Sequence, residues 1–226
     1  ALRIMGKLLR EHRGEELVKI IRSQKLVRPL QLYVAYEVSH QLGIEPENIL
    51  LEVELPVKNV DILIVDNTSG KDMPLLSISI RTQVASIKKN FTNNVNQLQG
   101  EVVSLKNYYP SLFTALVYLF SKVDMTTGED CTSYYSENIP HKLLPTIGYG
   151  GNNRDRFDAA LILVREWNDE GEPVSPSDLR LDFLRSYSPD AFWAKLSSLV
   201  GETRIKARYR LSLLMQRNEQ EKFLGN

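Results

Sequence analysis

The sequence predicts a mixed α/β domain, in which helices flank a sheet of parallel and antiparallel strands. Continuous apolar runs at residues 113–120 and 157–164 are typical of buried central strands. Two further apolar runs, at 60–66 and 75–82, are separated by the polar turn 67–72, which predicts a hairpin. Segments with apolar residues at helical spacing precede and follow these runs, so we expect helices to cover the sheet.

The expected elements follow one another in a simple order. We expect strands at residues 49–55, 60–66, 75–82, 113–120 and 157–164. We expect helices at residues 5–24, 29–42, 93–108, 176–185, 189–200 and 203–222. Pro29 is expected in the first turn of its helix, which Gly43 ends. Residues 121–156 are polar and predict a long loop. The order predicts one domain over 1–226, with its core at about 30–165 and helical segments at 1–28 and 176–226.

Composition limits the function classes. The chain of 226 residues has a formal net charge of +0, so any affinity for nucleic acid must come from local patches. The single cysteine, Cys131, excludes a disulfide framework and a cysteine-based zinc site, and three widely separated histidines argue against a histidine-rich metal site. This usage fits a reducing cytoplasm. No apolar run approaches the length of a membrane span, so we expect no membrane partner.

Asp61 is the best single candidate for chemistry. It stands at the start of an otherwise apolar run, where burial of an unpaired acid is costly. Binding a hard metal ion is one way to compensate a buried carboxylate. The alternative is that Asp61 lies at a strand end, where it is solvated or caps a turn. The next run alternates and ends in a cation and an amide, Arg81 and Gln83.

These two runs resemble the core of the PD-(D/E)xK nuclease superfamily, which has the restriction-endonuclease-like fold. Val60-Asp61 stands where the family has Pro-Asp, and Ser79-Ile80-Arg81 stands where it has Glu-x-Lys. The resemblance covers residues of about 30–165. It implies a type II restriction endonuclease that cleaves double-stranded DNA sequence-specifically with Mg²⁺, usually as a symmetric homodimer.

The resemblance implies metal-binding roles for acidic residues. Asp61 would hold the Mg²⁺ ion, and Glu37 on the preceding helix would complete the site; an exposed helical glutamate is the alternative for Glu37. Ser79 replaces the second acid of the motif. Glu101, on the helix that follows, is the candidate for an acid that has migrated to a new position.

The resemblance also implies roles in handling the phosphate. Arg81 replaces the lysine of the motif, and an arginine can hold a phosphate bidentately. Lys88 or Lys89 is the alternative for the lysine role. Gln83 copies the position of an amide that contacts water or phosphate in related sites.

Two segments offer side chains that suit DNA. Residues 83–94 contain serine, lysine and asparagine at the opening of a helix, and a polar surface loop with a helix cap is the alternative. The long loop carries side-chain types that read base edges. The candidate DNA-binding residues are Lys88, Lys89, Asn90, Asn152, Asn153, Arg154 and Arg156.

Two other functions remain open from the sequence. One is a catalytically inactive DNA-binding or structural subunit on the same fold, with a site that has decayed at Ser79 and Arg81. The other is a protein-interaction domain whose sheet only mimics the motif. Metal binding at Asp61 separates the first from the second, and strand cleavage separates the enzyme from both.

Overall fold

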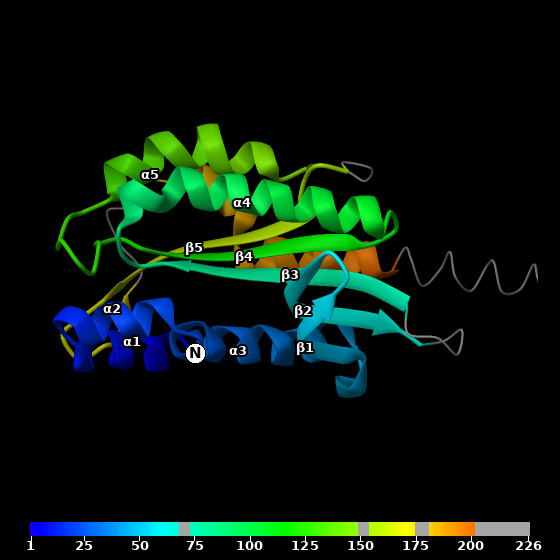
Figure 1. Ribbon diagram of the computed structural model, residues 1–226, viewed down its shortest axis with the longest axis horizontal. Coiled ribbons are helices and arrows are strands. Elements are labelled where there is room, and N and C mark those ends of the chain that lie inside the picture. The colour runs from blue at the N-terminus through cyan, green and yellow to red at the C-terminus, as the bar shows by residue number, and fades with distance from the viewer. Residues whose placement is uncertain (68–72, 149–153, 175–180, 202–226) are drawn as a thin grey trace, which may run out of the picture.

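The computed structural model describes residues 1–67, 73–148, 154–174 and 181–201. Six strands form one sheet in the order β1-β2-β3-β4-β5-β6 (Figure 1). The strands are β1 (Ile49–Leu55), β2 (Lys58–Asp66), β3 (Met73–Gln83), β4 (Phe113–Ser121), β5 (Ala159–Trp167) and β6 (Pro173–Val174). The five expected strands are therefore confirmed, with ends that differ by a few residues.

The sheet is mixed, as expected. The strands β1, β2 and β3 form an antiparallel meander, and β4 and β5 then run parallel to β3. The helix α4 (Ile87–Tyr108) makes the crossover from β3 to β4, because parallel neighbours cannot be joined by a tight turn. The short strand β6 pairs with β5 in the antiparallel sense at the other edge.

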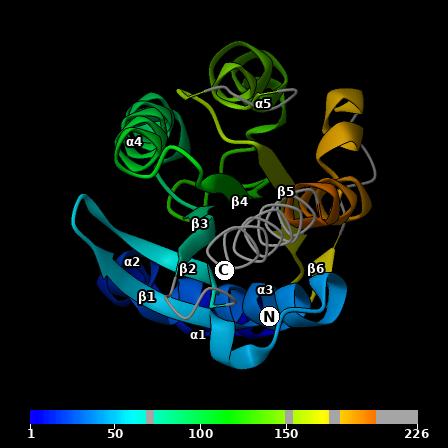
Figure 2. The ribbon, with the colours of Figure 1, turned by 90° about the vertical axis from the view of Figure 1, so that its right-hand side faces the viewer.

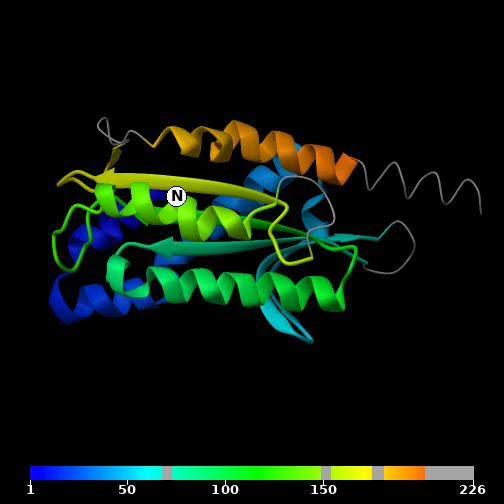
Figure 3. The same ribbon diagram turned by 90° about the horizontal axis from the view of Figure 1, so that it is seen from above.

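Helices cover both faces of the sheet (Figure 2). The helices α1 (Leu2–Glu11), α2 (Gly14–Arg22) and α3 (Gln24–Leu42) lie on one face, and α4 and α5 (Thr132–Asn138) lie on the other. Residues 189–201 are helical and pack on the α1–α3 face, beside β5 and away from α4 (Figure 3). Both ends of the described chain therefore share one core with the sheet.

The N-terminal helices differ from the expectation. The predicted helix over 5–24 is two helices, with a break before Gly14, whose φ is +55°. The sequence predicts Pro29 in the first turn of its helix, and this prediction is wrong. The helix α3 begins at Gln24, so Pro29 lies inside it. Gly43 ends α3 in the left-handed conformation, as expected.

The later helices also differ in part. The helix α4 begins before the expected residue 93, because Asp124 accepts the Ile87 N–H at 2.8 Å and so caps the helix from a distant loop. The expected loop 121–156 contains α5 and the short helical turns η2 (Ile139–Leu143) and η3 (Leu144–Thr146).

Two of the expected helices lie partly or wholly outside the described residues. A short helix, η4 (Asp182–Tyr187), stands near the end of the segment predicted at 176–185, whose beginning lies outside the described residues. The predicted helix at 203–222 lies outside them entirely. Within the ranges that the structure describes, no helix has the length and apolar character needed to cross a membrane.

Candidate active site

The β1–β2 hairpin changes face where Glu52 and Asp61 lie opposite each other. The ladder pairs Leu51 with Ile62 and Val53 with Val60, which places Glu52 and Asp61 between these two pairs. Residues two apart in a strand normally share a face. Here Ile62 packs against the α1–α3 layer, whereas Val60 packs in the cluster that includes Leu105 of α4.

This change of face moves the far end of the hairpin toward α4. Glu52 has a φ of +53°, a left-handed conformation that is costly for a residue with a side chain. Beyond it, the hairpin rises from the α1–α3 side toward α4 (Figure 2). Lys58, at the start of β2, forms an ion pair with Glu101 on α4.

Asp61 lies where β2 separates from β3. The ladder between the two strands ends with the pair Ile62 and Ile78. One residue before Ile62, Asp61 Oδ2 accepts the main-chain N–H of Ile80 at 2.7 Å. The carboxylate therefore takes the place of a strand carbonyl. The main-chain carbonyl of Asp61 accepts the Gln31 side-chain amide from α3 at 2.7 Å.

Arg81 joins Asp61 to Glu101. Its Nη1 lies 3.4 Å from Asp61 Oδ2 and donates to the Ile80 carbonyl at 3.1 Å. Its Nη2 donates to Glu101 Oε1 at 2.5 Å. One guanidinium thus contacts oxygen atoms from β2, β3 and α4. We call Lys58, Asp61, Arg81 and Glu101 the charged cluster.

The charged cluster is partly buried. The exposed fractions of its side chains are 21% for Lys58, 24% for Asp61, 31% for Arg81 and 17% for Glu101. Burial lowers the pKa of Lys58, against the opposing effect of Glu101. Burial also raises the pKa of Asp61, although the Ile80 N–H and the charges of Arg81 and Lys58 act against the rise. Two acids and two bases therefore balance one another in a medium that disfavours each charge alone.

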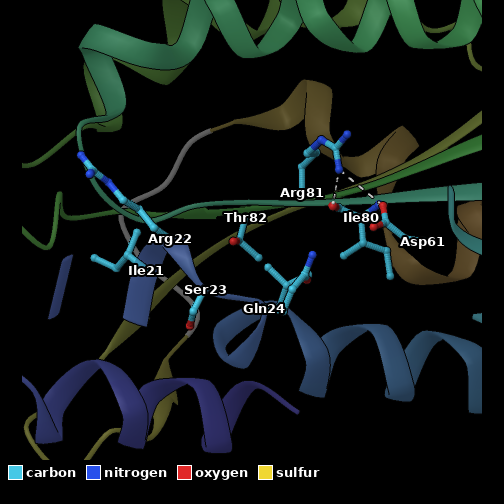
Figure 4. Close-up of a pocket in the computed structure, with 9 residues that line it drawn as sticks. Ile21, Arg22, Ser23, Gln24, Asp61, Ile80, Arg81 and Thr82 are labelled. Atoms are coloured by element: carbon cyan, nitrogen blue, oxygen red, sulfur yellow. Dashed lines mark hydrogen bonds and ion pairs between the residues drawn. The ribbon is translucent and has the colours of Figure 1, made fainter. Parts of the chain in front are cut away.

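An open pocket borders the cluster (Figure 4). Its floor is the part of β3 that β2 no longer covers, and its wall is the junction of α2 and α3. Asp61 lies at one end of the pocket and Arg22 at the other, with Gln24 and Thr82 between them. The pocket is lined by Ile21, Arg22, Ser23, Gln24, Val27, Asp61, Ile80, Arg81 and Thr82.

The structure does not bring Glu37 to Asp61. Glu37 lies six residues after Gln31 on α3, which is about 240° around the helix axis. It accepts a hydrogen bond from Gln41 at 3.1 Å and raises the pKa of Tyr33, after the larger effect of burial. The second acid beside Asp61 is Glu101.

Ser79 and Gln83 lie on β3, on the same side as Arg81, and both are buried. The Gln83 amide donates to the Ile87 carbonyl at 2.9 Å, and its oxygen accepts the Tyr118 hydroxyl at 2.7 Å. The polar atoms of Gln83 are therefore engaged within the protein. The predicted contact of Gln83 with water or phosphate has no support in this arrangement.

The predicted DNA-binding residues lie away from the cluster. Lys88, Lys89 and Asn90 are exposed in the first turn of α4, and Lys89 lies about 18 Å along the helix from Glu101. Lys88 pairs with Glu129 at 2.5 Å.

The other predicted DNA-binding residues precede β5. Arg154 and Arg156 are exposed there, and Arg156 lies 3.9 Å from Asp155. This segment is at the end of α4 opposite to Lys88, because Lys106 in the last turn of α4 pairs with Asp158. Asn152 and Asn153 lie outside the described residues.

Two residues of the site had no strong signal in the sequence. Lys58 follows the turn Pro56-Val57 and precedes Asp61 by three residues, so only its position in a hairpin leading to an acid marks it. Gln31 follows Gln24 and Arg28 at spacings of seven and three, which places all three on one face of α3. This polar stripe, beside the buried apolar residues of α3, was the available sign.

The oxygen atoms of the cluster fit a small divalent cation. Mg²⁺ takes carboxylate and carbonyl oxygens and keeps several waters, so it needs only one or two protein carboxylates. Asp61, Glu101 and the Ile80 carbonyl supply such oxygens around one cationic group. Among the residues that the structure describes, no group of three or more His, Cys, Asp or Glu side chains is placed to hold a metal ion.

Comparison with protein-family models, with curated proteins and with solved structures found no match to this chain.

Proposed function

We propose that the protein is a Mg²⁺-dependent nuclease that cleaves double-stranded DNA, in the manner of a type II restriction endonuclease. The observation that carries the proposal is the meeting of Asp61 and Glu101, from β2 and α4, on one guanidinium. The element order agrees with the restriction-endonuclease-like resemblance: helix, three-strand meander, helix and two further strands. Glu101 is also the candidate for the migrated acid, and its contact with Arg81 beside Asp61 supports this role.

Each residue of the cluster has a role in this proposal. Asp61 and Glu101, with the Ile80 carbonyl, would hold the Mg²⁺ ion, which supplies Lewis-acid polarisation and an activated water when bound. Lys58 is a compact cation on Glu101 and suits the lysine role better than Lys89, which lies far from the acids. Arg81 would hold the phosphate and stabilise charge that develops on it.

The proposal includes two further features. Cleavage of both strands needs two such sites, so a two-fold symmetric homodimer is part of the proposal. Sequence-specific cleavage requires contacts to base edges, and Arg154 and Arg156 remain candidates for these contacts. A cytoplasmic location is also part of the proposal, because a chain with a single cysteine fits a reducing compartment.

One observation favours a second function. Arg81 and Lys58 together already balance the charges of Asp61 and Glu101, so the cluster is electrically neutral without a metal ion. A non-catalytic DNA-binding or structural subunit would keep such a network for stability alone.

Digestion of plasmid DNA in Mg²⁺ and in Mn²⁺ separates the two functions. We expect discrete fragments from the parent protein. Loss of a residue that only supports a metal ligand typically lowers activity by about 10- to 100-fold. Asp61 and Glu101 are proposed as direct ligands, so Asp61→Asn and Glu101→Gln should each lower activity by at least about 100-fold. Glu54→Gln, on an exposed position of β1, is the matched control and should cut like the parent. An uncut plasmid under every condition would favour the non-catalytic subunit.

A further inference from the structure

The Arg81 guanidinium stands where a cation would bind. Asp61 Oδ2, the Ile80 carbonyl and Glu101 Oε1 lie at 3.4, 3.1 and 2.5 Å from its nitrogen atoms. These oxygens come from three separate elements, so the fold itself gathers them. They are also the donors that fit a divalent cation, and guanidinium and metal ion therefore compete for them.

The charges of the cluster disfavour both cations together. Asp61 and Glu101 carry two negative charges, and Lys58 and Arg81 carry two positive charges, which gives a net charge of zero. A divalent cation added with Arg81 in place would leave +2 in a partly buried site. A phosphodiester brings −1 and a bidentate acceptor for the guanidinium.

Arg81 has a route to such a phosphate. Its side chain is 31% exposed and borders the pocket at the uncovered edge of β3 (Figure 4). The same pocket holds Gln24 and Thr82, which can donate to phosphate oxygens, and the cation of Arg22. Arg22 forms no ion pair with any residue in the described ranges.

We propose that Arg81 is an exchangeable counter-ion that couples DNA binding to cation binding. In the free protein it occupies the oxygen atoms of Asp61, Ile80 and Glu101. A DNA phosphate in the pocket draws the guanidinium away and leaves these oxygens to the divalent cation. Coupling of this kind is reciprocal, so the cation also strengthens DNA binding. This inference rests on the proposed function, because it takes the DNA phosphate as the competing ligand.

The first test uses Mn²⁺ alone on the free protein. Calorimetry should show that Arg81→Ala binds Mn²⁺ about tenfold more tightly than the parent, within the range of about 5- to 150-fold that is usual for coupled sites. Arg81→Lys should fall between them, since one ammonium cannot span both carboxylates, and this variant serves if Arg81→Ala does not fold. Arg3→Ala removes an exposed arginine from a distant ion pair and is the matched control.

The second test measures affinity for a DNA duplex with cleavage-resistant phosphorothioate linkages, by fluorescence anisotropy with and without Mn²⁺ at constant ionic strength. Divalent cations normally weaken electrostatic DNA binding, so a rise in affinity for the parent that is lost in Arg81→Ala supports the coupling. Equal Mn²⁺ affinity of parent and Arg81→Ala, or weaker binding by the variant, overturns it. If Arg81→Ala gains Mn²⁺ affinity but the parent neither binds nor cuts DNA, the competition at the oxygens stands and the nuclease proposal fails.

Discussion

Glu52 and Asp61 face each other across the β1–β2 ladder, and the left-handed backbone of Glu52 is the point at which the hairpin changes face. The Glu52 side chain pairs with Arg28 at 2.5 Å, and Arg28 donates to Gln31, which holds the Asp61 carbonyl. A strained residue and its partners thus support the position of the proposed metal ligand. Strain of this kind is often found at functional sites.

The strain at Glu52 predicts an unusual order of stability. Glycine adopts a positive φ without cost, so Glu52→Gly should be more stable than Glu52→Ala by about 1 kcal/mol. Both variants lose the Arg28 pair, and their difference isolates the backbone. Urea denaturation measures it. At Glu54 on the same strand, whose φ is not positive, alanine should be the more stable of the two; the same order at both positions would contradict the assignment of strain.

The Gln31 side chain should matter for the site more than for the fold. Its amide is the partner of the Asp61 carbonyl, so Gln31→Leu should lower Mn²⁺ affinity by about 10- to 100-fold, as loss of an outer partner does. Gln41→Leu, on the same helix beside Glu37, is the control and should bind Mn²⁺ like the parent. Equal calorimetric affinity in both variants would remove Gln31 from the support of Asp61.

The Lys106–Asp158 pair is a buried ion pair whose loss should be severe. The two side chains are 6% and 7% exposed and lie 2.9 Å apart, and Asp158 also accepts the Thr114 N–H. Asp158→Ala leaves an uncompensated charge, so the free energy of unfolding should fall by about 3–5 kcal/mol. Asp182→Ala breaks an exposed pair with Arg185 and should change it by less than about 1 kcal/mol. If Asp158→Ala and Asp182→Ala lowered the free energy of unfolding by similar amounts, the buried pair would contribute no more to stability than the exposed pair.

Asp124 predicts a pH-dependent contribution to stability. Burial alone would raise its pKa, but hydrogen bonds from Thr126 and from main-chain N–H groups, including that of Ile87, outweigh burial and lower the pKa. A lowered pKa stabilises the fold above the pKa of the unfolded state, about 4, and this stability is lost as the pH falls through the folded value. Asp124→Asn should therefore be less stable than the parent at neutral pH, and thermal melts should converge in acid. A gap that is independent of pH would show that the charge of Asp124 contributes nothing.

Cys131 should be nearly inert in the folded protein. Burial, with a smaller contribution from the charges of Asp124 and Glu129, raises the pKa of its thiol to about 11. The thiolate is the reactive form, so iodoacetamide at about pH 8 should modify the folded chain far more slowly than the chain unfolded in urea. Rapid modification of the folded protein would contradict the buried position of Cys131.

Much of the fold could be predicted because each strand has a local signal, a run of apolar residues in the sequence. The runs at 60–66 and 113–120 are mostly apolar, and the sheet places both among its interior strands. The ends of the helices were harder to predict from the sequence. The cap on α4 comes from Asp124, which is 37 residues from Ile87, and no local pattern contains that bond.

The candidate site, like the fold, has some features that the sequence predicts and others that it does not. Asp61, Arg81 and Glu101 were candidates by residue type, and the structure brings them together. Lys58 reaches Glu101 only because the hairpin changes face at Glu52, a backbone feature that has no signature in residue type. The prediction that Glu37 completes the metal site is wrong about the helix face. The face of α3 toward Asp61 carries Gln31, and Glu37 lies on a different face.

The helix α4 is held at both ends. Asp124 fixes its first turn, and the Lys106–Asp158 pair fixes its last turn. Glu101 lies between these two anchorage points, so the helix has little freedom to slide along its axis and carry the carboxylate with it. The charged cluster can therefore rearrange mainly by rotation about side-chain bonds, chiefly those of Arg81. Such motion is fast and local, and it would let the site respond to a ligand while the sheet and its helices remain still.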